Sequence, residues 1–159
     1  EAVKSKKTPT CLIFSRQGTS AISRTEDQLS LINKGGYLID ESDNSDITLI
    51  ASGSEVQLII DAAKELKNHS ISANVVSMPS LDLFLQQSEE FQSSIINPDK
   101  PILVVECSHP NSWYRILNRK DKVIGIESFG ESAPGSELLD HFGFNTENVV
   151  NSAKSLLND

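Results

Sequence analysis

Two kinds of apolar pattern alternate along this chain. Runs of neighbouring apolar residues, such as Ile102-Leu103-Val104-Val105, are typical of strands that are covered on both faces. Between most of these runs, apolar residues recur every three or four positions, which indicates amphipathic helices. A strand followed by a helix is the repeating unit of α/β domains. The runs predict strands at 37–39, 48–51, 74–77, 102–106 and 123–126.

The clearest strand-to-helix transition lies at residues 46–67. Gly53 permits a tight turn, and Ser54 with Gln57, like Ser52 with Glu55, has the spacing of a capping box. A helix N-terminus can bind an anion, but this turn has neither a Gly-x-Gly-x-x-Gly pattern nor a Lys or Arg, so a structural turn remains the alternative. The apolar stripe of the helix consists of Val56, Ile59, Ile60, Ala63 and Leu66.

Three further helix signals follow. Ser80 and Ser88 are suitable N-caps of short helices, and Gly143 is suited to end a helix. A last helix is predicted near the C-terminus. Its apolar positions are Val149, Val150, Ala153, Leu156 and Leu157.

The first 34 residues are organised differently. Residues 1–7 are typical of a helix end, 10–15 of an apolar strand, and 18–34 of a polar linker that Gly35-Gly36 closes. Residue 1 is Glu and the only methionine is Met78, so we expect a fragment. In a fragment the strand at 10–15 would lack its sheet, so we expect an exposed apolar edge that is mobile, swapped or paired with another copy.

Size and charge narrow the class of protein. A chain of 159 residues suits one globular domain with its own core. Its 22 acidic and 14 basic side chains give a net charge of −8, which disfavours nucleic acid and anionic membranes. No apolar stretch is long enough for a membrane span, and Cys11 and Cys107 form no metal or disulfide motif. We therefore expect a soluble protein of the reducing cytoplasm.

Candidate chemistry is sparse. Cys107 and His109 follow a strand and would face the same side beside Glu106, which suggests a thiolate–imidazole pair or simply a loop. Residues 125–130 have the two-glycine spacing of a phosphate loop, but Glu131 stands where a lysine is needed. His69, His109 and His141 have no helical partner at i+4, so we expect no metal site.

Arg16 is the strongest candidate for ligand binding. It stands at the carboxyl end of the strand predicted at 10–15, and α/β sheets bind ligands at that end of their strands. A guanidinium group offers a fork of donors to phosphate. Pairing with a nearby acid is the structural alternative.

Several segments together resemble the transketolases over essentially the whole chain. They occur in the family's order and at compatible spacing. These segments are LIFSRQ at 12–17, GGY at 35–37, IASGSEV at 50–56, VVSMPS at 75–80, WY at 113–114, FGESAP at 129–134 and FGF at 142–144.

The resemblance implies a domain organisation. Residues 1–17 would be the last helix and strand of a pyrimidine-binding domain, 18–34 a linker, and 35–159 a transketolase C-terminal domain. That domain is implied to be a three-layer α/β/α fold with a mixed five-stranded sheet, mostly parallel with one antiparallel edge strand. It is also implied to contribute to a homodimer.

The resemblance also implies a function. A transketolase uses thiamine diphosphate and a divalent cation such as Mg²⁺ to move a two-carbon ketol unit from a ketose phosphate to an aldose phosphate. The catalytic, cofactor-binding and metal-binding residues would all precede residue 1, so the chain alone would be inactive. Arg16 matches the family's arginine that binds the sugar phosphate.

Two departures and two alternatives accompany this interpretation. Gly18-Thr19 stands where the family usually has an Asn and an apolar residue, which puts the loop shape after Arg16 in doubt. Residues 107–109 stand where smaller side chains are commoner. A related thiamine enzyme, such as deoxyxylulose-phosphate synthase or a keto-acid dehydrogenase subunit, would share the fold. A noncatalytic binding or assembly module with the same fold is the other alternative.

Overall fold

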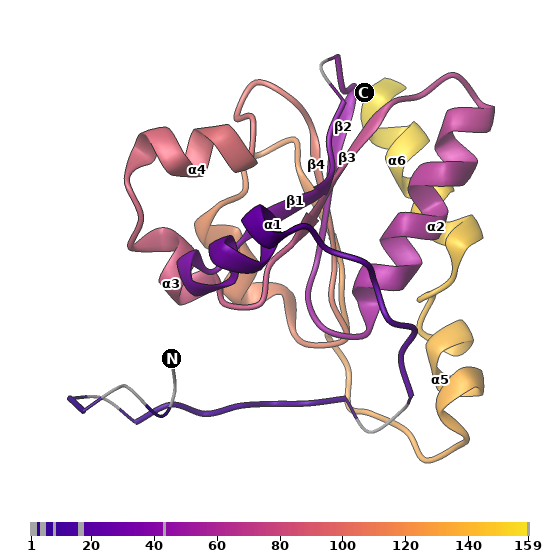
Figure 1. The fold of residues 1–159 in the computed structure, drawn as a ribbon. Helices are drawn as coiled ribbons and strands as arrows, with labels where there is room; N and C mark the ends of the chain where they lie inside the picture. Colours follow the sequence, from indigo (N-terminus) through magenta and orange to yellow (C-terminus); the bar gives the residue numbers. More distant parts are fainter. Residues whose placement is uncertain (1–2, 4–5, 8, 16–17, 43, 159) are drawn as a thin grey trace.

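The computed structural model describes residues 3, 6, 7, 9–15, 18–42 and 44–158. Its centre is a five-stranded sheet in the order β1-β3-β2-β4-β5 (Figure 1). β1 is antiparallel to β3, and the other neighbouring pairs are parallel. The strands predicted between residues 37 and 126 and the mixed sheet with one antiparallel edge are confirmed. The strands are β1 (Tyr37–Asp40), β2 (Ile47–Ala51), β3 (Ala73–Ser77), β4 (Ile102–Val105) and β5 (Lys122–Ile124).

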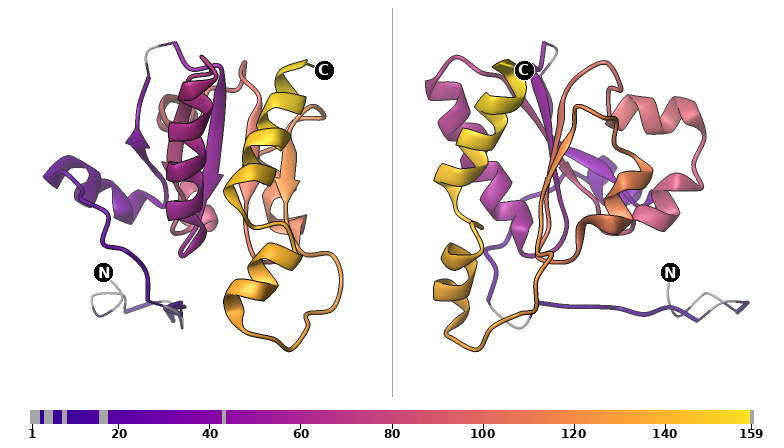
Figure 2. Two further views of the ribbon diagram at one scale, coloured as in Figure 1. Left: turned by 90° about the vertical axis from the view of Figure 1, so that its right-hand side faces the viewer. Right: turned by 180° about the vertical axis from the view of Figure 1, so that it is seen from behind.

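Helices cover both faces of the sheet. The helices of the described chain are α1 (Glu26–Leu31), η2 (Ile32–Lys34), α2 (Glu55–Asn68), α3 (Leu81–Leu85), α4 (Glu89–Ile95), η3 (Pro110–Arg115), α5 (Gly135–His141) and α6 (Thr146–Asn158). α2 and α6 lie on one face, and α3 and α4 on the other (Figures 1 and 2). The fold is therefore the predicted three-layer α/β/α arrangement. None of the helices in the described part of the chain is long and apolar enough to cross a membrane.

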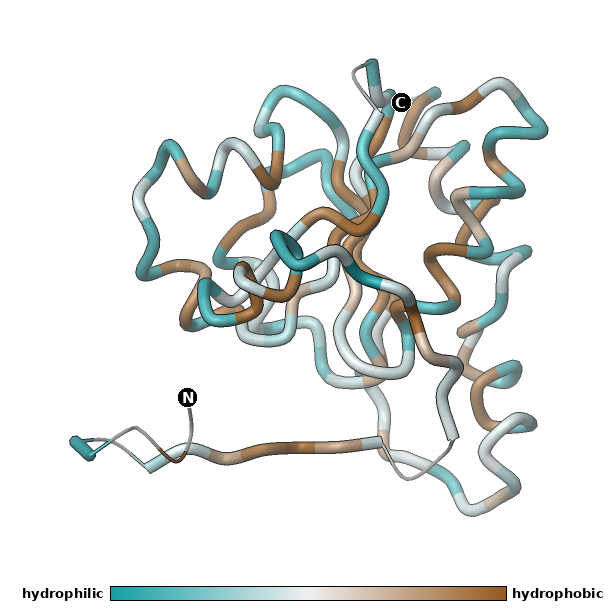
Figure 3. Tube along the Cα trace, in the orientation of Figure 1, coloured by the Kyte–Doolittle hydropathy of each residue, from teal (hydrophilic) through white to brown (hydrophobic). Residues whose placement is uncertain are grey.

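The sheet separates two apolar cores. Successive strand residues point to opposite faces, so Leu49 of β2 enters the core under α2 and α6 while Ile50 enters the core under α3 and α4. All residues of β2 are buried, which explains its continuous apolar run. Brown apolar stretches therefore gather between the layers in Figure 3.

The helix ends agree with the sequence at some positions and differ at others. Ser80 and Ser88 accept hydrogen bonds from the amides of Leu83 and Phe91, as predicted N-caps should. Gly143 follows α5 with φ of 80°. The capping boxes predicted before α2 are wrong, because Ser54 makes no side-chain cap and the Ser52 hydroxyl donates to a distant carboxylate.

The segment 18–34 contains a helix that its polar pattern did not predict. α1 begins after Thr25, which forms a capping box with Gln28. The Gln28 side-chain amide also donates to the carbonyls of Leu38 and Ile39 in β1, at 2.9 and 3.2 Å. This end of the segment is thereby attached to the edge strand.

The apolar segment 9–15 lies away from the sheet. The strand predicted at 10–15 is wrong for this structure, because none of the five strands of the sheet pairs with these residues. The side chains of Leu12, Ile13 and Phe14 are 63%, 94% and 81% exposed. The expected exposure of this segment is confirmed. Its expected motion, swapping or pairing stays a prediction. Of the helix end predicted at 1–7, the structure describes residues 3, 6 and 7.

Candidate functional site

The sheet changes direction between β2 and β4. From β2 the chain continues to β3 on one side, and it then crosses to β4 on the other side. α/β sheets bind ligands at such a switch point, outside the carboxyl ends of the strands. Here the loops after β2 and β4 bring together residues from 52–55 and 106–109.

A cluster of polar side chains joins these loops. The Ser52 hydroxyl donates to Glu106 Oε2 at 2.7 Å, and the Ser54 hydroxyl donates to Glu55 Oε1 at 2.7 Å. Glu55 is the first residue of α2 and only 7% exposed, and the Cys107 thiol lies near it. Two carboxylates thus lie close together at the switch point.

Burial and neighbouring negative charge perturb this cluster. Burial raises the pKa of Glu106, and the nearby Glu55 charge raises it further, although the Ser52 hydrogen bond acts in the opposite direction. Burial also raises the pKa of the Cys107 thiol, with further contributions from Glu55 and Glu106. Cys107 therefore stays a thiol at neutral pH and is a poor nucleophile.

The thiolate–imidazole pair suggested for Cys107 and His109 is not formed, because the two side chains have different neighbours. Cys107 lies near Glu55, whereas His109 Nδ1 accepts a hydrogen bond from the amide of Asn111 at 3.3 Å. His109 is the N-cap of η3. Both residues instead lie in a loop that follows the parallel strand β4, which was the alternative to a catalytic pair.

A cavity of about 500 Å³ opens beside the cluster. Its walls are mostly apolar, and Ser54, Glu55 and Gln57 supply polar groups from the start of α2. No Lys or Arg occurs among the described residues that line it. The other lining residues are Gly18, Thr19, Ser20, Cys107, Ile126, Gly130, Glu131, Gly135, Leu138, Leu139, Phe142 and Phe144.

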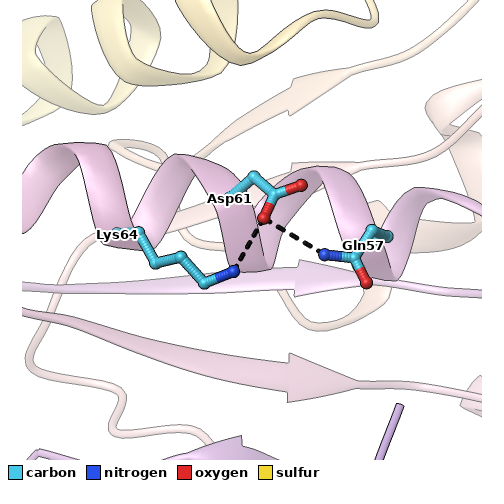
Figure 4. A network of polar contacts seen from close by, with 3 residues as sticks. All are labelled: Gln57, Asp61 and Lys64. Carbon is cyan, nitrogen blue, oxygen red and sulfur yellow. Dashed lines mark hydrogen bonds and ion pairs between the residues drawn. The ribbon is translucent and has the colours of Figure 1, made fainter. Parts of the chain in front are cut away.

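Hydrogen bonds along α2 restrain Gln57 at the edge of this cavity. Its amide donates to Asp61 Oδ1 at 3.1 Å, and Lys64 donates to the same oxygen at 2.9 Å (Figure 4). The Lys64 hydrogen bond lowers the pKa of Asp61, and the bond from Gln57 acts in the same direction. These contacts are local helix pairs of the i, i+3 and i, i+4 kind.

The loop at 125–131 is shaped by packing. A Cβ on Gly125 would lie 3.0 Å from the Ser108 carbonyl oxygen and 3.2 Å from Pro110 Cδ, so the glycine permits close approach of two loops. Glu131 Oε1 lies 3.5 Å from His141 Nε2 on α5. The ring of Phe129 is 98% exposed. These contacts give the loop a structural role. Glu131 stands where a phosphate loop would have its lysine.

Arg16, the predicted phosphate-binding residue, lies outside the described residues. Its role therefore stays a prediction. The described residues that follow it, Gly18 to Ser20, line the cavity.

The described residues do not fit thiamine diphosphate and its cation. No group of three or more His, Cys, Asp or Glu among them could hold a metal ion. The cavity presents Glu55 and Glu131 without a Lys or Arg, and these carboxylates would repel a diphosphate. No step of a thiamine reaction can be assigned to these side chains.

The mixed sheet with its switch point between β2 and β4 defines an α/β domain. The chain belongs to the transketolase-like TK C-terminal domain family, whose model matches residues 35–145. It is 41% identical to transketolase 1 of Vibrio parahaemolyticus over 98% of the chain, and 41% identical to the transketolase of Bacillus subtilis over 99%. Each alignment spans 24% of the relative's length.

Solved structures agree with this assignment. The transketolase of Leishmania mexicana matches with a TM-score of 0.82 at 30% identity, over 90% of this chain and 20% of that one. The transketolase of Campylobacter jejuni matches with a TM-score of 0.72 at 39% identity, over 78% of this chain and 19% of that one. The resemblance found in the sequence motifs is thereby confirmed.

The buried carboxylate cluster was not predicted. Glu55 follows the turn after β2 and Glu106 directly follows β4, so their positions at two strand ends were visible in the sequence. That β2 and β4 are neighbours was not visible, because strand order follows from tertiary packing.

Proposed function

We propose that the chain is the C-terminal portion of a transketolase that transfers a two-carbon ketol unit between sugar phosphates. The observation that carries the proposal is the alignment of 98% of the chain, at 41% identity, with only 24% of a transketolase. The domain division at 1–17, 18–34 and 35–159 belongs to the same proposal.

The cofactor would be held elsewhere in the enzyme. Because the described side chains do not fit thiamine diphosphate and Mg²⁺, the remaining part of the protein would bind both, and this chain alone would be inactive. By analogy with the family, the protein would act in the cytoplasm, in the pentose phosphate pathway, and would form a homodimer. The related thiamine enzymes and the noncatalytic module are not favoured, because the matched relatives are named transketolases.

Arg16 would contribute to substrate binding. A guanidinium group forms paired, charge-assisted hydrogen bonds with phosphate oxygens, and such bonds are stronger than neutral ones. The side chain would orient the phosphorylated end of the sugar without contacting the reacting carbon atoms.

The test is ketol transfer between pentose phosphates by the longer protein, with thiamine diphosphate and Mg²⁺ supplied. Arg16→Ala should lower kcat/KM roughly 10–150-fold, mainly through KM, because the lost contact is worth about 1.5–3 kcal/mol. Arg119→Ala, at an exposed position, is the matched control and should leave kcat/KM unchanged. Transfer that is insensitive to Arg16→Ala would remove the site but keep the family function. Absence of transfer would reject the function.

A further inference from the structure

We infer that a second cavity, between α3, α4 and η3, binds a small carboxylic acid with an aromatic or branched apolar body. This cavity has a volume of about 170 Å³ and lies at the amino ends of β4 and β5. It is on the face of the sheet that α3 and α4 cover (Figure 1). It is therefore separate from the cavity at the carboxyl end. The inference does not rest on the proposed function, because Arg16 takes no part in it.

Buried apolar side chains form one side of the second cavity. They are Phe84 of α3, Ile96 of α4 and Ile102 of β4. All three belong to the core between the sheet and the α3–α4 layer, so packing on several sides fixes their positions. A dry apolar cavity of about 150 Å³ holds one benzene molecule. The volume therefore suits a ligand whose apolar body has about six carbon atoms.

The polar part of the lining carries one positive charge. Arg115, the last residue of η3, lies beside the neutral side chains of Gln92, Ser93 and Asn118. No Asp or Glu occurs among the described residues that line this cavity. A guanidinium group binds a carboxylate through paired, charge-assisted hydrogen bonds. The charge of the lining therefore selects an anion, and the apolar side selects one with a hydrocarbon body.

An ion pair from outside the cavity holds the guanidinium in place. Arg115 Nη1 donates to Asp82 Oδ1 at 2.6 Å, which joins η3 to α3. A guanidinium group has five N–H donors, and this is the one hydrogen bond that Arg115 forms with the described residues. The remaining donors can bind a ligand while the bond to Asp82 persists. A restrained donor loses less entropy when the ligand binds.

The neighbouring Gln92 cannot replace Arg115 as a donor. Its side-chain amide donates to the carbonyls of Leu85 and Gln87, at 3.4 and 2.9 Å. Both of its N–H groups are thus occupied within the turn between α3 and α4. Arg115 is therefore the group that distinguishes a carboxylate from a neutral molecule of the same shape.

Titration of benzoate into the longer protein, followed by ligand-observed NMR, tests the inference. We expect saturable binding with a Kd of about 0.1–5 mM, as for a ligand of about nine non-hydrogen atoms. Benzamide, which has the same shape without the charge, should bind at least tenfold more weakly. A saturating pentose phosphate should change the Kd of benzoate less than twofold, because the cavity is separate from the proposed substrate site.

Two variants with matched controls locate the binding site. Arg115→Gln removes the cation, and Ser93→Phe should place a ring over the cavity from α4. Each should raise the Kd of benzoate at least tenfold. The controls Arg119→Gln and Ser94→Phe change residues that do not line the cavity, so they should leave the Kd within twofold. All four positions are exposed, so the variants should fold.

Four results would overturn the inference. Absence of saturable binding up to about 20 mM benzoate would show that the cavity takes no such ligand. Equal affinity for benzamide would remove the role of the guanidinium. Binding that both variants retain would place benzoate elsewhere on the protein. Competition with the pentose phosphate would place it in the substrate site.

Discussion

The Ser52 hydroxyl donates a 2.7 Å hydrogen bond to the carboxylate of Glu106, a residue 54 positions further along the chain. The bond connects the loop after β2 to the end of β4 at the switch point of the sheet. It also places a favourable donor on a carboxylate that is partly buried.

Removal of this donor should weaken the fold. Ser52→Ala should lower the free energy of unfolding by about 1–2 kcal/mol, because a hydrogen bond to a partly buried charged group is lost. Urea unfolding at neutral pH measures the change. Ser94→Ala is a suitable control, since its exposed hydroxyl donates only to the Phe91 carbonyl of its own helix. Equal stability of the two variants would contradict the role of Ser52.

Glu106 should make stability depend on pH. Its pKa is raised in the folded protein above 4.5, so the folded state holds the proton more tightly. Between the unfolded and folded pKa values the folded state binds more protons, and stability falls as pH rises through this window. Glu106→Gln should therefore gain stability relative to wild type on going from pH 4 to pH 7. Glu90→Gln, at an exposed position of α4, should show no such gain. The prediction is refuted if the stability difference between Glu106→Gln and wild type is the same at pH 4 and pH 7.

The two cysteines should differ in reactivity. Cys11 is exposed, whereas Cys107 is partly buried with a raised pKa. With iodoacetamide at pH 8, Cys107 should react at least tenfold more slowly than Cys11, because only the thiolate attacks. Mass spectrometry of the labelled peptides gives both rates. The two rates should become similar when the chain is unfolded in urea. Equal rates in the folded chain would contradict the raised pKa of Cys107.

Gly35 should tolerate no side chain. It has φ of 92°, and a Cβ would lie 2.3 Å from the Ser80 carbonyl oxygen and 2.4 Å from the Phe84 amide nitrogen. Gly35→Ala should cost about 2–4 kcal/mol of unfolding free energy, from backbone strain and displacement of α3. Gly130→Ala meets open space and should stay within about 0.5 kcal/mol in thermal unfolding. A small effect at Gly35 would mean that α3 can move freely.

Strands and long helices were predictable because their signals are local. β2 is a continuous apolar run because it is packed on both faces. α2 has an apolar stripe because it is packed on one face. The N-caps Ser80 and Ser88 were also predictable, because a hydroxyl accepts from an amide three residues later.

Contacts between distant residues were not predictable. Ser52 has the spacing of a capping residue, but its hydroxyl is bound to Glu106, which no local pattern reveals. α1 was missed because none of its residues is buried, so it has little apolar stripe, although Thr25 and Gln28 have the capping-box spacing. Its position depends on β1 instead.

The amide of Gln28 has a consequence for assembly. An edge strand normally offers its outward carbonyls to any extended chain that arrives. In β1 the carbonyls of Leu38 and Ile39 are already occupied by that amide, and α1 lies alongside. The sheet therefore stops at β1, and this side of the molecule is protected against open-ended growth into a ladder shared between chains.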